Sequence, residues 1–220
     1  MKVLIHACPA RMWYVEEFLV PSLLAQDVPR GDIEIWNDTA KRGNLLSFME
    51  SCAARTGDGG TWHIQDDVLL CRDFAKRCEE YDAETNRVVY GFCCERFTDN
   101  VDQTGLVHQP DSWHSFQCVR IPDAYARECA EWFFTDAQHR WIFKNWASTG
   151  KMDDSFFWSF MEDRHPGDLV RNAAPNLVNH VDWLIGGSVL SSWRGYIAAS
   201  DLWEDDELLE DLRTKLKARA

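Results

Sequence analysis

The sequence predicts a single α/β domain with a mostly parallel central sheet and helices on both faces. Short apolar, β-branched segments alternate along the chain with longer segments whose apolar residues recur at helical spacing. Strands that alternate with helices usually form a parallel sheet that is covered on both faces. The chain has 220 residues, of which 45% are hydrophobic and 27% charged, as in ordinary folded domains. One domain is therefore expected, because a chain of this length buries about 70% of its unfolded surface.

The first elements illustrate the alternation. Residues 2–8 (KVLIHAC) are apolar and β-branched, which predicts a strand. Residues 9–26 place Trp13, Phe18 and further apolar residues at helical spacing, with Pro21 as a kink or a boundary. The same alternation predicts further strands at residues 32–38, 61–65, 87–97 and 116–122, and further helices at residues 42–55, 72–81, 123–134, 152–164 and from Ser200 onwards.

The last predicted helix differs in character from the rest of the chain. It is acidic at its start and basic at its end, and its leucines, Leu208, Leu209, Leu212 and Leu216, fall on one face. We therefore divide the chain into a domain at residues 1–199 and a C-terminal amphipathic helix at residues 200–220. This helix is expected to dock on the body of the domain or on a second copy in a homo-oligomer.

Charge and apolar runs restrict the classes of function. A formal net charge of −13 argues against non-specific binding of nucleic acid by the whole surface, although a local basic cleft remains compatible with it. The apolar run before Pro9 is too short for a signal peptide, and no segment approaches the roughly 20 apolar residues of a membrane span. We therefore expect a cytoplasmic protein without a membrane partner.

Eight cysteines raise the alternatives of disulfides or a zinc site. None of them forms a Cys-x-x-Cys pair, and most lie inside apolar or helical patterns, where a free cysteine behaves as a small hydrophobic residue. Reduced, structural thiols are therefore expected.

Three acidic residues, Asp38, Asp66 and Asp67, lie at the carboxyl ends of predicted strands. Ligands of open α/β sheets bind beyond the carboxyl ends of the strands, so these side chains are expected to share one crevice. Adjacent carboxylates repel each other unless a cation offsets their charge, and Mg²⁺ or Mn²⁺ accepts oxygen ligands. The alternative is that Asp66 and Asp67 serve as turn and helix-cap residues before the helix at Asp73.

An ordered set of short motifs resembles the nucleotide-sugar-binding half of the GT-A glycosyltransferases. These motifs are the strand at 2–8, Arg11 in the segment after it, "WND" at the end of the second strand, Asn44 in the next helix, "HIQDDVLL", "GKMDDSFFWSFM" and "APNLVNHVDWLIGGS". The similarity covers roughly residues 2–190. It implies a GT-A-like (nucleotide-diphospho-sugar transferase) domain.

The resemblance also implies roles for individual residues. Asp67 and His180 would bind a divalent metal, Mn²⁺ or Mg²⁺, that bridges the diphosphate of the donor, and Asp66 would contact the ribose or the metal shell. Arg11, Asp38 and Asn44 would line the nucleotide pocket. Gln65 departs from the pattern, because it stands at the first position of the Asp-x-Asp motif, where an acidic residue is expected. This departure places the predicted metal shell in question.

The second acidic pair, Asp153 and Asp154, is a candidate for the catalytic base. An inverting transfer needs a carboxylate that removes the proton of the acceptor hydroxyl. The family pattern favours Asp154 over Asp153 for this role. The alternative is that both residues only complement the amino-terminal end of a helix.

Other candidates have weaker support. His63 lies inside an apolar strand and is expected to be a core residue. His108 and His114 lie in a predicted loop that can approach an acceptor, and Trp113 and Trp183 are candidates for stacking on a sugar or base.

The predicted function is the transfer of a sugar from a nucleotide-sugar, with a UDP-sugar as the expected donor. The acceptor can be a glycan, a protein, a small molecule or a modified nucleic-acid base. The alternatives are a noncatalytic nucleotide- or carbohydrate-binding module on the same fold, which Gln65 favours, and a metal-dependent nucleotidyltransferase. The last of these normally carries a glycine-rich basic loop after the first strand, which "HACPARMW" lacks.

Overall fold

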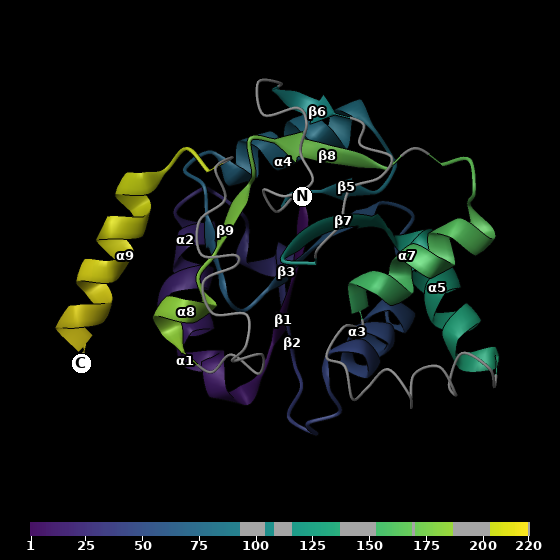
Figure 1. Cartoon of the computed structure of the whole chain (residues 1–220), viewed down its shortest axis with the longest axis horizontal. Helices are drawn as coiled ribbons and strands as arrows, with labels where there is room; N and C mark the ends of the chain where they lie inside the picture. Colours follow the sequence, from purple (N-terminus) through teal and green to yellow (C-terminus); the bar gives the residue numbers. More distant parts are fainter. Residues whose placement is uncertain (93–103, 108–115, 137–152, 169, 187–202, 220) are drawn as a thin grey trace.

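A seven-stranded sheet forms the centre of the molecule (Figure 1). The computed structural model describes residues 1–92, 104–107, 116–136, 153–168, 170–186 and 203–219. In spatial order the strands are β2 (Ile33–Asn37), β1 (Lys2–Ala7), β3 (Gly60–Gln65), β7 (Cys118–Pro122), β5 (Val89–Tyr90), β8 (Arg171–Ala174) and β6 (Gly105–Val107). A separate two-stranded sheet pairs β4 (Val68–Leu70) with β9 (Val178–His180).

Five of the seven strands run in one direction, and β7 and β6 run in the other. The mostly parallel sheet predicted from the alternation of strands and helices is therefore confirmed. The antiparallel strand β7 lies in the middle of the sheet, between β3 and β5.

Helices cover both faces of this sheet, as predicted. One face carries a first core cluster that includes Leu19, Leu23, Ile64 and Phe74. The helical segments that contribute to it are α1 (Met12–Tyr14), the π-helical turn η2 (Val15–Leu19), α2 (Val20–Leu24), α4 (Phe74–Glu84), α8 (Asp182–Ile185) and α9 (Asp206–Arg219), and the short turn η1 (Pro9–Arg11) precedes α1.

The opposite face carries a second core cluster that includes Phe48, Phe133, Phe157 and Phe160. It is built from α3 (Asn44–Ala53), α5 (Asp123–Thr135) and α7 (Asp153–Arg164), which lie together on the right of Figure 1. The remaining short helical turn, η3 (Arg30–Asp32), precedes β2.

The strands and helices differ from the predicted boundaries in three places. The single helix expected at residues 9–26 is a chain of short helical segments, and the change of geometry falls next to Pro21, in the first turn of α2. The strands β4, β6, β8 and β9 were not predicted, because segments of three or four residues are too short for a periodic pattern. Of the strand predicted at residues 87–97, the structure describes β5 and the residues up to Phe92; residues 93–97 lie outside the described part.

The C-terminal helix α9 docks on the body of its own chain. Leu209 and Leu212 are buried in the first core cluster, and Arg219 lies 4.0 Å above the ring centre of Trp13. Helix α9 begins at Asp206, and residues 200–202 of the predicted helix lie outside the described part. A homo-oligomer through this helix stays a prediction.

The six cysteines that the structure describes are all free thiols, and all except Cys8 are buried. This confirms the expected reduced state for these six; Cys93 and Cys94 lie outside the described residues. No described helix has both the length and the apolar composition that crossing a membrane requires.

Candidate active site

The path of the chain makes the carboxyl ends of β1 and β3 a switch point of the sheet, which is where the sequence predicts a crevice. The connection from β1 to β2 passes over the face of the first core cluster, whereas α3 carries the chain from β2 to β3 over the opposite face. Because β2 and β3 lie on opposite sides of β1, the two connections separate at this point of the sheet. Open α/β sheets bind their ligands at such a switch point.

The carboxyl end of β3 places Asp66 and Asp67 at this crevice. Nη1 of Arg11 lies 2.9 Å from Oδ1 of Asp66 and 2.5 Å from Oδ2 of Asp67, so a single guanidinium bridges the two carboxylates. The backbone N–H of Cys8 donates to Oδ2 of Asp66 at 2.7 Å. All three charged residues are buried, with at most 7% of their surface exposed. The cation that the acidic pair requires is therefore present in the chain itself.

The small sheet brings His180 to the same group. Val68 pairs with His180 across β4 and β9, and the N–H of Val181 donates to the carbonyl oxygen of Asp67. Nε2 of His180 then lies 3.2 Å from Oδ2 of Asp67. The predicted proximity of Asp67 and His180, which are far apart in the sequence, is observed. We call Arg11, Asp66, Asp67 and His180 the charged cluster.

Burial and ion pairing act against each other in the charged cluster. Burial alone would raise the pKa of Asp67, but the neighbouring His180 and Arg11 lower it to about 2. Burial and the charge of Asp67 raise the pKa of Asp66 above its ordinary value. The pKa of His180 is raised, because the carboxylate of Asp67 outweighs the effect of burial. Asp67 is therefore ionised, and the imidazolium form of His180 is stabilised beside it.

The charged cluster does not fit a divalent cation as it is arranged. Three of the four carboxylate oxygens of Asp66 and Asp67 are already within reach of nitrogen groups of the protein, and only Oδ1 of Asp67 is a buried oxygen without a hydrogen-bond partner. Among the described residues, no group of three or more side chains of the types His, Cys, Asp and Glu is arranged so that it could hold a metal ion. The roles of Asp67 and His180 as metal ligands stay predictions.

A second group of polar side chains lies on the α3–α7 side of the crevice. Asp153, the first residue of α7, accepts hydrogen bonds at Oδ2 from Nδ2 of Asn44 at 2.7 Å and from Nε2 of Gln65 at 3.3 Å. Asn44 begins α3 and Gln65 ends β3, so three elements meet at one carboxyl group. We call Asp153, Asn44 and Gln65 the carboxyl–amide cluster. Because Gln65 and Asp66 are neighbours, the two clusters adjoin at the end of β3.

The two members of the second acidic pair have different environments. Burial, followed by the charge of Asp154, raises the pKa of Asp153 to about 7. Asp154 accepts a hydrogen bond from the backbone N–H of Ser155 at 2.6 Å, as residues at a helix start commonly do. Asp153 is thus a buried carboxyl group between two amide donors, whereas Asp154 binds the backbone at the start of α7. The assignment of the catalytic base to Asp154 stays a prediction.

Asp38 has a local structural role. Its two carboxylate oxygens accept hydrogen bonds from the backbone N–H groups of Arg42 and Gly43, each at 2.9 Å. These bonds fix the loop between β2 and α3, whose last residue, Gly43, has a positive φ of 89°. The hydrogen bonds described for the side chain of Asp38 are thus with its own loop, and its predicted contact with a nucleotide stays a prediction.

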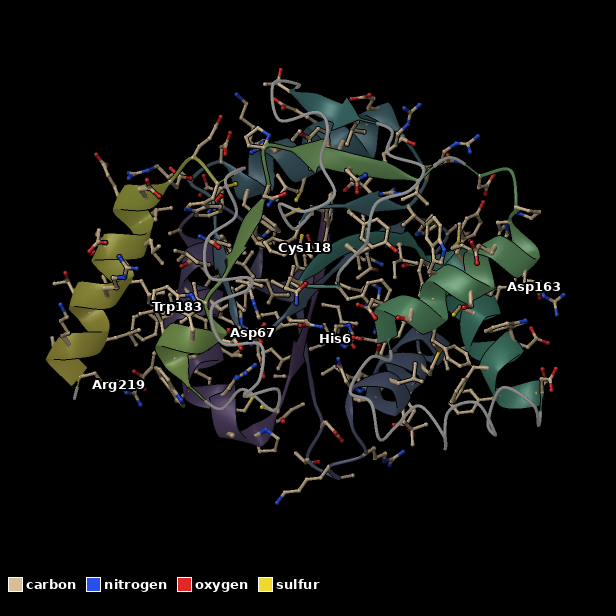
Figure 2. The ribbon with its side chains drawn as sticks, in the orientation of Figure 1. His6, Asp67, Cys118, Asp163, Trp183 and Arg219 are labelled. Carbon is tan, nitrogen blue, oxygen red and sulfur yellow. The ribbon has the colours of Figure 1, made fainter. Side chains whose placement is uncertain are left out.

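His6 is a site residue that the sequence interpretation missed. His6, labelled in Figure 2, lies next to Gln65 in the pairing of β1 with β3. Its Nε2 is 2.9 Å from Nδ1 of His63. Burial lowers the pKa of His6 to about 3 and that of His63 well below its ordinary value, so both rings are neutral. The position of His6 at the carboxyl end of the first strand was the signal that could have identified it. His63 is a buried core residue, as expected.

Of the remaining candidates, only Trp183 falls in the described part of the chain. Its ring is half-buried, and the guanidinium of Arg213 on α9 lies 5.0 Å from the ring centre. Trp183 thus contacts the C-terminal helix. His108, Trp113 and His114 lie outside the described residues.

Comparison with known proteins gives similarities of fold at low sequence identity. No protein-family profile matches the chain, and no curated protein matches it. Among solved structures, an active-site mutant of LgtC is 12% identical with a TM-score of 0.46, and the alignment covers 100% of this chain and 96% of that one. The galactosyltransferase LgtC in complex with donor and acceptor sugar analogues is 11% identical, with a TM-score of 0.40 and coverage of 96% and 94%.

A third similar structure is 4-diphosphocytidyl-2C-methyl-D-erythritol synthase from Anaerococcus prevotii DSM 20548. It is 10% identical, with a TM-score of 0.42, and the alignment covers 98% of this chain and 96% of the synthase. Because all three scores lie below 0.5, we argue function from the side chains of this chain alone.

Proposed function

We propose that the protein is a glycosyltransferase that moves a sugar from a nucleotide-sugar, with a UDP-sugar as the expected donor, to a hydroxyl acceptor. The observation that carries the proposal is the meeting of the charged cluster and the carboxyl–amide cluster at the switch point of the sheet. One side of this crevice holds fixed charges, and the other holds a carboxyl group with a pKa of about 7. A group transfer needs both kinds of chemistry.

Asp153 is the proposed catalytic base. A general base works best when its pKa lies near the working pH, and the pKa of about 7 meets this condition near neutrality. Asp153 removes the proton of the acceptor hydroxyl as the oxygen attacks the anomeric carbon. The bond from that carbon to the diphosphate breaks, and its electron pair leaves with the nucleoside diphosphate. Asn44 and Gln65 hold the carboxyl group in place through their amide N–H groups.

The nucleotide is proposed to bind beyond the ends of β1 and β3, with Arg11 and Asp66 on one side and Asn44 on the other. Arg11 is the positively charged side chain that bridges the two carboxylates. Each oxygen of Asp66 accepts one hydrogen bond from the protein, and a carboxylate oxygen can accept a second, from a ribose hydroxyl. The acceptor can be a glycan, a protein, a small molecule or a modified nucleic-acid base.

A thermal-shift screen tests the proposal. Nucleoside diphosphates and nucleotide-sugars are added to the protein, each with Mn²⁺ and with EDTA. A ligand that binds only the native state stabilises it by RT ln(1 + [L]/Kd), about 2.7 kcal/mol at a hundredfold excess over Kd. We expect a raised midpoint with at least one nucleotide, and the absence of any shift across the panel would refute the proposal.

The catalytic role of Asp153 is tested once the screen has provided a donor and an acceptor. Asp153→Asn keeps the size of the side chain but cannot accept a proton, so we expect kcat to fall by about 10²-fold or more while the Kd of the donor stays nearly unchanged. Asp154→Asn is the matched control and should have a much smaller effect. A larger loss of kcat for Asp154→Asn would assign the base to Asp154 instead.

A further inference from the structure

We propose that Arg11 closes the Asp66–Asp67 pair to divalent cations and itself supplies the positive charge that the pair requires. The proposal deepens the proposed function at the same site, because it implies that the nucleotide-sugar binds without a divalent metal. It starts from the disagreement between the predicted metal site and the contacts that these two carboxylates make.

The contacts of the four carboxylate oxygens leave little room for a cation. Oδ1 of Asp66 and Oδ2 of Asp67 accept hydrogen bonds from Nη1 of Arg11, and Oδ2 of Asp66 accepts one from the N–H of Cys8. Nε2 of His180 also lies beside Oδ2 of Asp67. Only Oδ1 of Asp67 is left, and hard divalent cations need about six oxygen ligands.

Arg11 is held in this position from several directions. Its Nε donates to the carbonyl oxygen of Gly186 at the end of α8, at 3.2 Å, and its backbone N–H donates to the carbonyl oxygen of Cys8. The residue is 7% exposed. Moving the guanidinium aside would leave two buried carboxylates without their shared partner, which is costly in the interior of a protein.

Electrostatic repulsion opposes the simultaneous presence of Arg11 and a metal ion. A guanidinium and a divalent ion bound by the same two carboxylates would be like charges a short distance apart, and such charges repel each other strongly where the protein excludes water. The pair can therefore hold the guanidinium or the ion, and the geometry of the free protein assigns it to Arg11.

Titration with Mn²⁺, followed by electron paramagnetic resonance of the free ion and without any nucleotide, tests this assignment. We expect wild-type protein to retain no Mn²⁺ at the pair. Arg11→Met, which keeps an apolar side chain in the space but removes the charge, should gain one equivalent of bound Mn²⁺. The double variant Arg11→Met/Asp67→Asn should lose it again.

A matched control uses another arginine that binds two acidic residues. Arg72 pairs with Asp205 and Glu207, but its side chain is 56% exposed. Since solvent screens these carboxylates, Arg72→Met should gain no Mn²⁺. A folded Arg11→Met that binds no Mn²⁺ would overturn the proposal. If Arg11→Met fails to fold, the Mn²⁺ titrations of wild type and of Asp67→Asn test the proposal. One equivalent of Mn²⁺ that binds wild type and is lost in Asp67→Asn would overturn the proposal. Wild type that binds no Mn²⁺ would support it.

A nucleotide arm separates this inference from the proposed function. The nucleotide identified by the screen should bind wild type with equal affinity in EDTA and in Mn²⁺. Binding that requires Mn²⁺ would refute the closure by Arg11 and leave the proposed function standing. If no nucleotide binds in either condition, the proposed function fails, while the nucleotide-free Mn²⁺ titration still tests Arg11.

Discussion

Asp153 combines a buried position with two amide donors, and this combination makes its ionisation sensitive to the fold. In the unfolded chain the carboxyl group has a pKa near 3.8, whereas in the folded protein burial and Asp154 raise the pKa to about 7. Between these two values the folded protein holds the proton and the unfolded chain does not. Asp153 therefore makes the folded state less stable as the pH rises from about 4 to about 7.

We predict that Asp153→Asn removes this loss of stability, because asparagine has no charge to bury. A pKa difference of one unit corresponds to about 1.4 kcal/mol, so the variant should gain stability relative to wild type as the pH rises, with the largest gain above pH 7. Urea unfolding at a series of pH values measures the difference. If wild type and Asp153→Asn differed in free energy of unfolding by the same amount at every pH in this range, the carboxyl group of Asp153 would not be buried as described.

The charged cluster predicts a different response at Asp67. This carboxylate lies between Arg11 and His180 and is 6% exposed. Breaking a buried ion pair by removing one partner costs about 3–5 kcal/mol, because the other charges stay buried. Asp67→Asn should therefore lower the free energy of unfolding by about 3 kcal/mol.

Urea unfolding measures the free energy of unfolding, and Asp211→Asn is the control. Asp211 pairs with Lys215 on the exposed face of α9. Exposed ion pairs contribute about 0–1 kcal/mol, so this variant should stay close to wild type. Equal losses for the two variants would contradict the view that burial makes the charged cluster important for stability.

At the level of whole elements, α9 shows how a surface helix is held by one apolar face. Leu209 and Leu212 enter the first core cluster, while Arg213 and Arg219 lie over the rings of Trp183 and Trp13. The helix also contacts the elements of the charged cluster indirectly, because Trp183 lies on α8, whose end accepts a hydrogen bond from Arg11.

We predict that Leu212→Ala lowers the free energy of unfolding by about 2–5 kcal/mol, as expected for a leucine that is 3% exposed. Leu24→Ala on α2 is the control, because Leu24 is 42% exposed and should change stability by less than about 0.5 kcal/mol. Urea unfolding measures both. If Leu212→Ala changed only the association state and left the stability of the monomer intact, the leucine would belong to an interface between copies.

The sequence predicted the long elements well and the short ones poorly. Helices α5 and α7 and strands β1 and β3 lie within a few residues of their predicted positions, since each shows several repeats of its periodic pattern. Strands β4 and β9 have three residues each and form only because they pair with each other across more than a hundred residues. No local pattern contains that information.

The candidate site could also be predicted only in part: the residues at strand ends could be placed, and the contacts that depend on packing could not. The carboxyl ends of parallel strands meet, which places Asp66 and Asp67 at the crevice from the sequence alone. The bridge from Arg11 to both carboxylates was not foreseen, because it depends on where the turn after β1 directs a side chain. The contact of Gln65 with Asp153 likewise depends on how α7 packs on the sheet.

At the scale of the whole molecule, one sheet joins the two core clusters. Strand β7 contributes Cys118 to the first core cluster and Val119 and Ile121 to the second, since successive side chains of a strand point to opposite faces. The crevice lies where elements of both clusters meet, at the end of β3. A substitution in either cluster is therefore expected to lower the free energy of unfolding of the whole domain.

We predict that the chain unfolds in a single transition that responds to substitutions in either cluster. Leu23 in the first cluster and Phe160 in the second are both fully buried, so Leu23→Ala and Phe160→Ala should each cost about 2–5 kcal/mol. Urea unfolding is followed by far-ultraviolet circular dichroism and by the summed fluorescence of the eleven tryptophans, which include Trp62 in one cluster and Trp132 in the other. In a single cooperative unit the two signals keep a common midpoint in every variant. If the circular dichroism and fluorescence signals of a variant had different midpoints, the two core clusters would unfold independently. The site between them would then form only when the two clusters are packed together.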